Sequence, residues 1–202
     1  HLVVAPALHG AVDREALPDA KDWRDLIAHD AALDILPMPF DHPLWIVYSS
    51  GTTGMPKPIV HSHGGVTLEA LKTHALHSNM SKDDVFHWYT SSGWIMWNSQ
   101  VAGLLIGATI AIYDGSPALP DLTRIWRFVD EARVTVFGCG AAFLIKSMKD
   151  GFVPSQGRGF EKLRAINSTG SPLPLDAYAW VYENVKRDLW LASISGGTDI
   201  AS

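Results

Sequence analysis

The sequence is poor in cysteine and in charged residues. Cys139 is the only cysteine among 202 residues, which excludes an intrachain disulfide and favours a reducing, cytoplasmic setting. Charged residues make up 18% of the chain and the formal net charge is −5, a balance that disfavours broad electrostatic binding to nucleic acid or anionic lipid. Because 47% of the residues are hydrophobic, the composition indicates an ordinary globular protein with neither a nucleic-acid partner nor a membrane partner.

Long hydrophobic runs and a secretory leader are also missing. The longest nearly unbroken apolar stretch runs from Val101 to Tyr113 and is too short to span a bilayer. Its glycines predict the end of a helix, a turn at Gly107 and then a strand. The chain opens without methionine or a basic leader, and residues 200–202 follow a motif with no closing element. We therefore expect the chain to be a piece of a longer protein.

Several common catalytic motifs are absent. The chain has no G-x-S-x-G sequence, so serine-hydrolase chemistry has no nucleophile elbow. Gly138-Cys139-Gly140 follows a predicted strand, but Phe143 stands where the dinucleotide-binding fingerprint requires glycine. His61 and His63 could reach one metal ion, yet no second ligand pair at zinc-like spacing accompanies them. Cys139 is expected to be a small buried residue in the wall of a pocket rather than a nucleophile.

Strand-like and helix-like patterns alternate along the chain. Short apolar runs predict strands at 2–4, 46–48, 59–61, 85–89, 109–113, 134–137, 164–166 and 191–194. Apolar residues at helical spacing predict helices around 22–29, 64–77, 121–129, 141–148 and 178–185, the second with Leu68, Leu71 and Ala75 facing the core. Such alternation predicts an α/β layered fold with a largely parallel sheet and flanking helices. Residues 1–43 are expected to be a leading segment and connector, and residues 44–202 the ligand-binding core.

The most informative stretch is a loop between residues 48 and 57 that is rich in hydroxyls and glycine. It follows Leu44–Val47, an apolar run that predicts a buried strand. Exposed backbone N–H groups, hydroxyl donors and the cation of Lys57 together suit a polyphosphate. It is not a Walker loop, because Pro56 stands where that motif requires glycine and Pro58 where it requires serine or threonine. The alternative is a polar loop with a solvated lysine.

Three more polar turns that contain glycine follow predicted strands. They are Ser91–Trp94, Ser168–Pro172 and Ser195–Asp199. In parallel α/β sheets ligands bind beyond the carboxyl ends of the strands, so we expect these turns and the loop at 49–57 to share one edge. Asp199 could hold Mg²⁺, which prefers one or two carboxylates together with phosphate oxygens. Each turn taken alone could equally be an ordinary polar loop.

As a set, these motifs are specific in their order and separations. They resemble the adenylate-forming superfamily of acyl-CoA synthetases, luciferases and peptide-synthetase adenylation domains; the segments that carry the resemblance are 48–57, 93–94, 169–173 and 197–199. The amino-acid sequences of Gly115–Pro117 and Ser193–Ile200 resemble most closely those of the acetoacetate-activating branch of that superfamily. The resemblance extends over about residues 44–201.

The resemblance implies a two-step ligase that uses ATP, Mg²⁺ and CoA. The carboxylate of acetoacetate attacks the α-phosphorus of ATP and displaces pyrophosphate. The thiol of CoA then displaces AMP from the acyl-adenylate and leaves acetoacetyl-CoA. Both steps depend mainly on positioning and on stabilising charge on phosphoryl oxygens.

The resemblance also implies roles for individual residues. Those expected around the β- and γ-phosphates are Ser50, Thr52, Thr53 and Lys57, with Ser49, Gly51 and Gly54 in the same nucleotide-binding loop. Those expected along adenine are Gly170, Ser171 and Pro172. Thr198, next to Gly197, would contact the α-phosphate and Asp199 would hold the metal, so the implied catalytic residues are Thr198, Asp199 and Lys57.

Two positions depart from the wider superfamily. Asp199 stands where glutamate is usual and its side chain is one methylene shorter, so a water could have to bridge it to the metal. Gly196 stands where acetyl-activating relatives place a tryptophan whose ring closes the acyl pocket. Without that ring a longer acyl group has room, so we expect a pocket for a four-carbon keto acid at Gly196, Trp94, Gly138, Cys139 and Gly140.

The superfamily also needs a ribose-binding aspartate, a hinge and a lysine on a mobile C-terminal domain, which we expect to lie beyond these 202 residues. The chain alone is therefore expected to be catalytically inactive. Three alternatives remain open: a ligase for another short or medium-chain acid, a nucleotide-binding module without turnover, and a purely structural α/β domain. The sequence does not predict an oligomeric state.

Overall fold

The computed structural model describes residues 2–4, 15–49, 54–117 and 119–201, which fall into two compact units, His1–Pro37 and Met38–Ser202. The first unit contains the parallel strands β1 (Leu2–Val4) and β2 (Ala20–Asp22) and the short helix α1 (Trp23–Ile27). Asp22 caps α1, because its carboxylate accepts a hydrogen bond from the Arg24 amide at 2.8 Å. The strand at 2–4 is confirmed, whereas β2 was not predicted.

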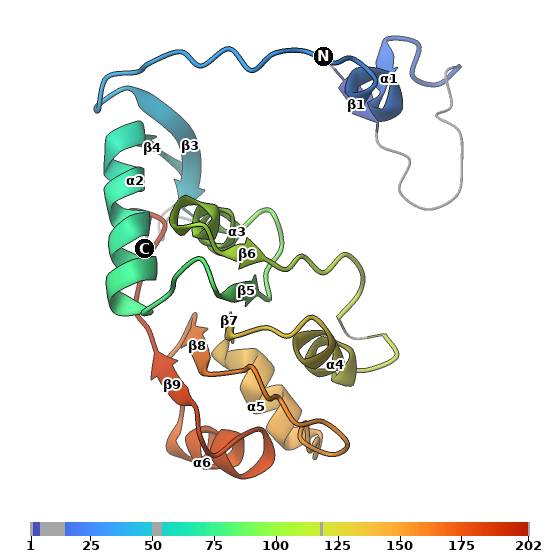
Figure 1. Cartoon of the computed structure of the whole chain (residues 1–202), viewed down its shortest axis with the longest axis vertical. Helices are drawn as coiled ribbons and strands as arrows, with labels where there is room; N and C mark the ends of the chain where they lie inside the picture. The colour runs from blue at the N-terminus through green and yellow to red at the C-terminus, as the bar shows by residue number, and fades with distance from the viewer. Residues whose placement is uncertain (1, 5–14, 50–53, 118, 202) are drawn as a thin grey trace. The chain divides into compact units, whose positions relative to one another are not determined.

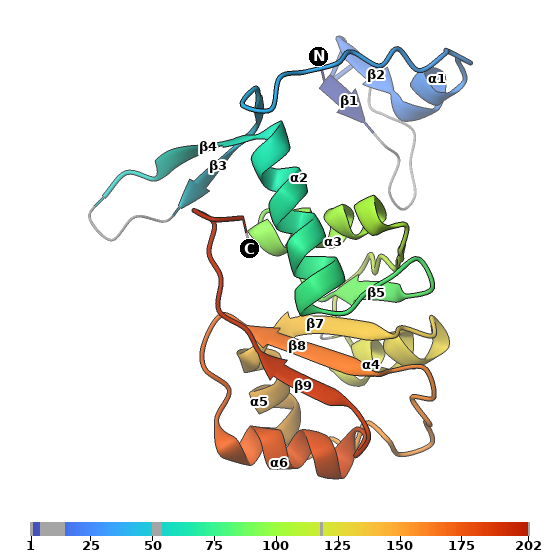
Figure 2. The ribbon, with the colours of Figure 1, turned by 60° about the vertical axis from the view of Figure 1, so that its left-hand side comes forward.

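The second unit is built on a five-stranded parallel sheet in the order β6-β5-β7-β8-β9 (Figures 1 and 2). Its strands are β5 (Val85–Trp88), β6 (Thr109–Ile110), β7 (Val136–Gly140), β8 (Ala165–Thr169) and β9 (Trp190–Ser193). Every pairing within this sheet is parallel. The α/β fold with a largely parallel sheet is thus confirmed.

Helices cover both faces of this sheet (Figure 2). They are α2 (His63–Leu71) with its π-helical continuation η1 (Lys72–His77), α3 (Ile95–Ala102), the 3₁₀ turn η2 (Gly103–Ile106), α4 (Thr123–Glu131), α5 (Ala141–Lys149) and α6 (Leu175–Asn184). The stretch from Val101 to Tyr113 forms a helix end, a left-handed turn at Gly107 and a strand, as predicted. Across the described ranges, no helix combines the length and the apolar character that crossing a bilayer requires.

The core consists of two apolar clusters on opposite faces of the sheet. Alternation along β7 sorts its side chains, with Phe137 on the face of α4, α5 and α6 and Val136 on the other face. The larger cluster includes the predicted helical stripes, since Ile125, Trp126 and Leu144 are fully buried there. Rigid packing on both faces fixes where each strand ends, and so where the turns at the carboxyl edge lie.

The apolar run before the hydroxyl-rich loop is not a buried strand, which corrects the sequence prediction. It belongs to β3 (Pro43–Ser49), which pairs antiparallel with β4 (Lys57–Ser62) in a separate two-stranded sheet. Alternate side chains point outward, so Ile46 is 57% exposed while Trp45 and Val47 are half-buried. The loop is therefore a hairpin connection and not the carboxyl end of a parallel strand.

The inward face of α2 also differs from the prediction. Val66, Ala70 and His74 are buried, whereas Leu68 is 60% exposed and Ala75 is exposed. His74 lies in the π-helical turn η1, and its Nε2 donates to the Ser99 carbonyl at 2.9 Å. The error of the prediction lies in the phase of the helix, because Val66 and Ala70 already face inward within the regular turns of α2.

Candidate functional site

Three of the four predicted loops contribute residues to one cavity of about 810 Å³ in the second unit. Ser49 and Pro56 reach it from the hairpin, Trp94 from the turn after β5, and Thr198 and Asp199 from the turn after β9. The other described residues that line it are Ile46, Val47, Tyr48, Ser92, Gly93, Ile95 and Asn98. A mixed lining of apolar rings, hydroxyls and one carboxylate suits a ligand that combines a flat apolar part with a charged part.

Trp94 enters the cavity because a turn and a helix start coincide there. Its amide donates to the Ser91 carbonyl at 3.2 Å, and its own carbonyl accepts from the Trp97 amide at 3.0 Å as α3 begins. The indole is 70% exposed. Gln100 holds α3 against the sheet, since its buried side chain accepts from the Trp88 amide at 2.8 Å and donates to the Ala111 carbonyl at 2.9 Å.

A second cavity, of about 310 Å³, contains the residues expected along adenine. It is lined by Thr169, Gly170, Ser171, Pro172, Ser193, Ile194, Ser195 and Gly196. The two segments are joined where the Ile194 amide donates to the Ser168 carbonyl at 2.8 Å and the Thr169 hydroxyl donates to the Ile194 carbonyl at 3.1 Å. Gly170 has a φ of +87°, a left-handed conformation that glycine adopts without strain.

Gly138, Cys139 and Gly140 line neither of these cavities. The Cys139 side chain lies fully buried in the larger apolar cluster, and burial raises the pKa of its thiol, so the thiol stays protonated and unreactive. Gly138 lies against the Trp88 ring, since a Cβ built there would come within 2.1 Å of Trp88 Cε3. The other two residues of the expected acyl pocket line different cavities, Trp94 the larger and Gly196 the smaller. The acyl pocket therefore stays a prediction.

The loop that was expected to bind phosphate is described only in part. Ser50, Gly51, Thr52 and Thr53 lie outside the described residues. Gly54 has a φ of +137°, and Lys57 is exposed at the start of β4, where it pairs with Ser49. Among the described residues that line the large cavity, its neighbour Pro56 is present and Lys57 is not.

Asp199 is the one carboxylate among the described residues that line the large cavity. A Cβ built on Gly197 would lie 2.4 Å from Asp199 Oδ1, so the carboxylate folds back over the glycine. Within the parts of the chain that the structure describes, no three His, Cys, Asp or Glu side chains gather as a metal-ligand group. A single carboxylate fits Mg²⁺ when phosphate oxygens supply further ligands, which is how this ion commonly binds nucleotides.

His61 contacts the main chain of Asp199 at this site, although the sequence suggested it only as one half of a metal-binding pair with His63. The indole of Trp45 donates to His61 Nδ1 at 2.8 Å, and His61 Nε2 lies 3.2 Å from the main-chain carbonyl of Asp199. These contacts satisfy both ring nitrogens and leave none for a metal ion. The antiparallel register, which places His61 opposite Trp45, is the signal that would have revealed the contact with Trp45.

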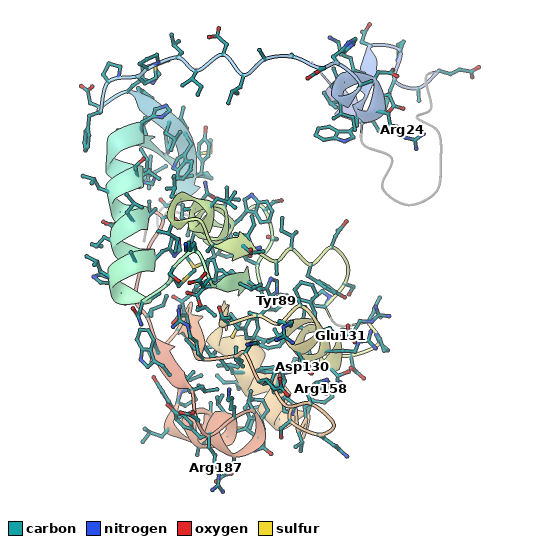
Figure 3. The ribbon with its side chains drawn as sticks, in the orientation of Figure 1. Arg24, Tyr89, Asp130, Glu131, Arg158 and Arg187 are labelled. Atoms are coloured by element: carbon teal, nitrogen blue, oxygen red, sulfur yellow. The ribbon has the colours of Figure 1, made fainter. Side chains whose placement is uncertain are left out.

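A further cavity, of about 200 Å³, lies at the opposite edge of the sheet. It lies between α4 and the segment before β8, and its lining includes Asp130, which Figure 3 labels, and Leu163. Asp130 already accepts a hydrogen bond from the Phe160 amide at 3.0 Å. The cavity contains none of the predicted site residues, so the carboxyl edge of the sheet remains the candidate site.

The chain is similar to known enzymes over almost its entire length. It is 42% identical over 196 residues to an acetoacetyl-CoA synthetase of Danio rerio, a match that covers 94% of this chain and 29% of the relative. It is 46% identical over 165 residues to an acetoacetyl-coenzyme A synthetase of Rhizobium meliloti, covering 82% of this chain and 25% of the relative. The chain thus spans less than a third of the length of these curated relatives.

The fold agrees with these sequence matches. The structure superposes on acetoacetyl-CoA synthetase from Streptomyces lividans with a TM-score of 0.89 and 43% sequence identity, over 99% of this chain and 31% of that one. The family model described as AMP-binding enzyme matches residues 3–195. The hydroxyl-rich hairpin and the parallel sheet lie within that match, and the chain therefore belongs to the family of AMP-binding enzymes.

Proposed function

We propose that this chain is the nucleotide- and acyl-binding part of an ATP-dependent ligase that activates acetoacetate and transfers it to CoA. The observation that carries the proposal is the cavity of about 810 Å³, where Ser49, Thr198 and Asp199 meet Trp94. The similarity to acetoacetyl-CoA synthetases from an animal and from two bacteria supports the choice of reaction.

The first step is the attack of the acetoacetate carboxylate on the α-phosphorus of ATP. A P–O bond forms to the carboxylate, the bond to pyrophosphate breaks, and acetoacetyl-AMP results. In the second step the CoA thiol, as it loses its proton, attacks the acyl carbon, and AMP leaves with the electron pair of the broken C–O bond. Neither step needs an oxidant or a reductant.

The residues of the cavity have distinct proposed roles. The Thr198 hydroxyl contacts the α-phosphate and stabilises the negative charge that develops on its oxygens during the attack. Ser49 and Lys57, with the hydroxyls at 50, 52 and 53, bind the β- and γ-phosphates. Asp199 holds Mg²⁺, which supplies positive charge to the phosphate oxygens when it is bound.

Gly170, Ser171 and Pro172 are proposed to contact adenine from the smaller cavity, which also contains Gly196. The absence of a side chain at Gly196 leaves space for an acyl group larger than acetyl. Space of this kind discriminates between acids by about 1–3 kcal/mol for each methylene-sized difference. The proposed preference for acetoacetate over acetate therefore rests on this position.

The test is acetoacetate-dependent exchange of pyrophosphate into ATP, measured on the protein expressed at full length from its gene. We expect exchange with acetoacetate, weaker exchange with butyrate and least with acetate, followed by acetoacetyl-CoA formation when CoA is added. A preference for butyrate would favour the alternative of a general short-chain ligase. Binding of ATP without exchange for any acid would overturn the proposal and favour a nucleotide-binding module.

Gly196→Trp tests the acyl pocket separately. The added ring should lower kcat/KM for acetoacetate and raise the ratio of acetate to acetoacetate activity by about 10-fold or more. His77→Trp, which adds the same ring at an exposed position outside both cavities, is the control. An unchanged preference in Gly196→Trp would show that Gly196 does not face the acyl group.

A further inference from the structure

His61 joins the hairpin of β3 and β4 to a segment 138 positions further along the chain. Its Nδ1 lies 2.8 Å from Trp45 Nε1 on β3, its own main chain belongs to β4, and its Nε2 lies 3.2 Å from the Asp199 carbonyl oxygen. The ring of Trp45 also meets the imidazole nearly edge-on, with ring centroids 6.3 Å apart. His61 is therefore held by a hydrogen bond and by a ring contact from the same residue.

The partners of His61 determine where its proton is. An indole N–H can only donate, so Nδ1 of His61 must accept and carries no hydrogen. The neutral ring then has its hydrogen on Nε2, which is the nitrogen that faces the Asp199 carbonyl. Trp45 thus fixes the tautomer in which His61 can donate to Asp199.

The hydrogen bond from His61 reaches a segment, residues 194–200, that has few other hydrogen bonds among the described residues to fix its main chain. Residues 194–197 have no regular secondary structure, and Asp199 is exposed at the cavity. The segment begins at the hydrogen bond from the Ile194 amide to β8, and the Ile200 amide closes a turn with the Gly197 carbonyl at 3.3 Å. His61 supplies a second fixed point at the far end of the segment, next to the side chains of Thr198 and Asp199.

We propose that His61 is a positioning residue for the ligase reaction, a proposal that rests on the proposed function. Through the hydrogen bond to the Asp199 carbonyl it holds the main chain so that the Thr198 hydroxyl and the Asp199 carboxylate face the reacting phosphate. It does not touch the substrate itself. Misplacement of such groups by about 1 Å can lower a rate by about 100-fold, because attack requires close alignment.

A set of substitutions at His61 separates this role from a general effect on folding. His61→Ala removes the donor. His61→Gln extends its amide N–H to about the position of Nε2, whereas the shorter amide of His61→Asn reaches only about the position of Nδ1. His77→Ala, a change of an exposed histidine at the end of η1, is the matched control.

The measurement is kcat and KM for acetoacetate-dependent pyrophosphate exchange, on the full-length gene product, with melting temperature recorded for every variant. We expect His61→Ala and His61→Asn to lower kcat about 10- to 100-fold with KM for acetoacetate changed less than threefold. His61→Gln should recover most of the lost kcat, and His77→Ala should equal the unaltered protein. Trp45→Phe, which keeps the ring and removes the indole donor, should lower kcat by a smaller factor, about 2- to 5-fold.

The outcomes distinguish the two proposals. Full kcat in His61→Asn, or equal losses in His61→Gln and His61→Ala, in a protein that is otherwise active would overturn the role of His61 and leave the proposed function intact. A lower melting temperature with unchanged kcat would assign His61 to stability alone and would also overturn it. Absence of exchange in the unaltered protein would instead overturn the proposed function, and with it the reaction that His61 is proposed to serve.

Discussion

The guanidinium of Arg164 forms a bidentate ion pair with the carboxylate of Asp84. Arg164 Nε and Nη2 lie 3.0 Å from Asp84 Oδ1 and Oδ2, respectively. The same carboxylate accepts hydrogen bonds from the Thr135 hydroxyl at 2.7 Å and from the Ser81 amide at 2.8 Å. Because Asp84, Thr135 and Arg164 directly precede β5, β7 and β8, the cluster joins the amino ends of the three central strands.

This arrangement sets the charge state of Asp84. Burial alone would raise the pKa of the carboxyl, but the hydrogen bonds from Arg164, Thr135 and Ser81 outweigh burial and hold the pKa below its ordinary value. The carboxylate is therefore charged and fully paired at neutral pH. The cluster lies at the edge of the sheet opposite the candidate site, so it supports the fold without contributing to the chemistry.

Removing Arg164 should destabilise the protein. Arg164→Leu leaves the Asp84 carboxylate, whose side chain is 9% exposed, without its counter-charge. We expect a loss of about 2–4 kcal/mol in the free energy of unfolding, less than for a wholly buried pair because 36% of the Arg164 side chain is exposed. Urea unfolding measures this loss of stability. The control is Lys146→Met, which removes the exposed ion pair with Asp150 and should lower the free energy of unfolding by about 1 kcal/mol or less. Equal losses in the two variants would contradict the importance of the buried pair.

The sequence predicted the parallel sheet because its strands are short apolar runs between amphipathic helices. Val136 and Phe137 are both buried, on opposite faces, and such two-sided burial is what a run of apolar residues indicates. The same reasoning failed for Leu44–Val47, which looks alike in sequence but lies in a hairpin with outward-facing side chains. Apolar content alone does not reveal how many faces of a strand are covered.

The sequence predicted which segments form the candidate site, but it did not predict which residues contact one another there. Glycine- and hydroxyl-rich turns mark Trp94, Thr198 and Asp199, because such residues adopt tight turns after strands. The contact between His61 and Asp199 joins residues 138 positions apart, and only the fold brings them together. Cys139 was expected in a pocket wall, yet its position on β7 turns its side chain into the core.

His87 should make stability depend on pH. It is buried against Phe128 and Phe137, its Nδ1 donates to the Ala111 carbonyl at 2.9 Å, and burial lowers its pKa from 6.5 to about 4. Between those two values the unfolded chain binds a proton that the folded chain does not, so the free energy of unfolding falls as the pH drops from about 6.5 to about 4. The loss should amount to about 3.5 kcal/mol at most, since one pKa unit corresponds to about 1.4 kcal/mol.

Urea unfolding at pH 7 and pH 5 measures this dependence. His87→Phe should flatten it, leaving a residual slope to which His74 contributes, because burial lowers the pKa of His74 as well. His77→Gln alters an exposed histidine and serves as the control. A slope in His87→Phe as steep as in the unaltered protein would show that His87 is not the group that titrates.

Two glycines of β7 should differ in how much stability the same substitution costs. A Cβ on Gly138 would come within 2.1 Å of the Trp88 ring, whereas the nearest atom to a Cβ on Gly140 is the Thr169 carbonyl oxygen at 3.9 Å. Gly138→Ala should therefore lower the free energy of unfolding by about 1–3 kcal/mol through overpacking. Gly140→Ala should change it by about 0.5 kcal/mol or less. Melting temperatures of the two variants measure the difference, and a stable Gly138→Ala protein would mean that Trp88 can move aside.

Gln100 should be needed for the position of α3 at the cavity. Its side chain is 1% exposed, accepts from the Trp88 amide and donates to the Ala111 carbonyl. Gln100→Leu keeps the approximate volume but leaves the buried Trp88 amide without an acceptor, while the Ala111 carbonyl still receives the hydrogen bond from His87. One buried N–H without a partner costs about 1–3 kcal/mol, so we expect that decrease in the free energy of unfolding.

The same variant should also alter Trp94, which begins α3 and lines the large cavity. Loosening of α3 would increase the solvent exposure of the indole, which quenching by iodide would detect when Trp94→Phe is used to subtract its signal. Gln156→Leu, a matched change at an exposed loop position, should alter neither stability nor quenching. If Gln100→Leu lowered stability but left the Trp94 signal unchanged, Gln100 would support the sheet alone, and the placement of Trp94 would depend on the turn at Ser91 instead.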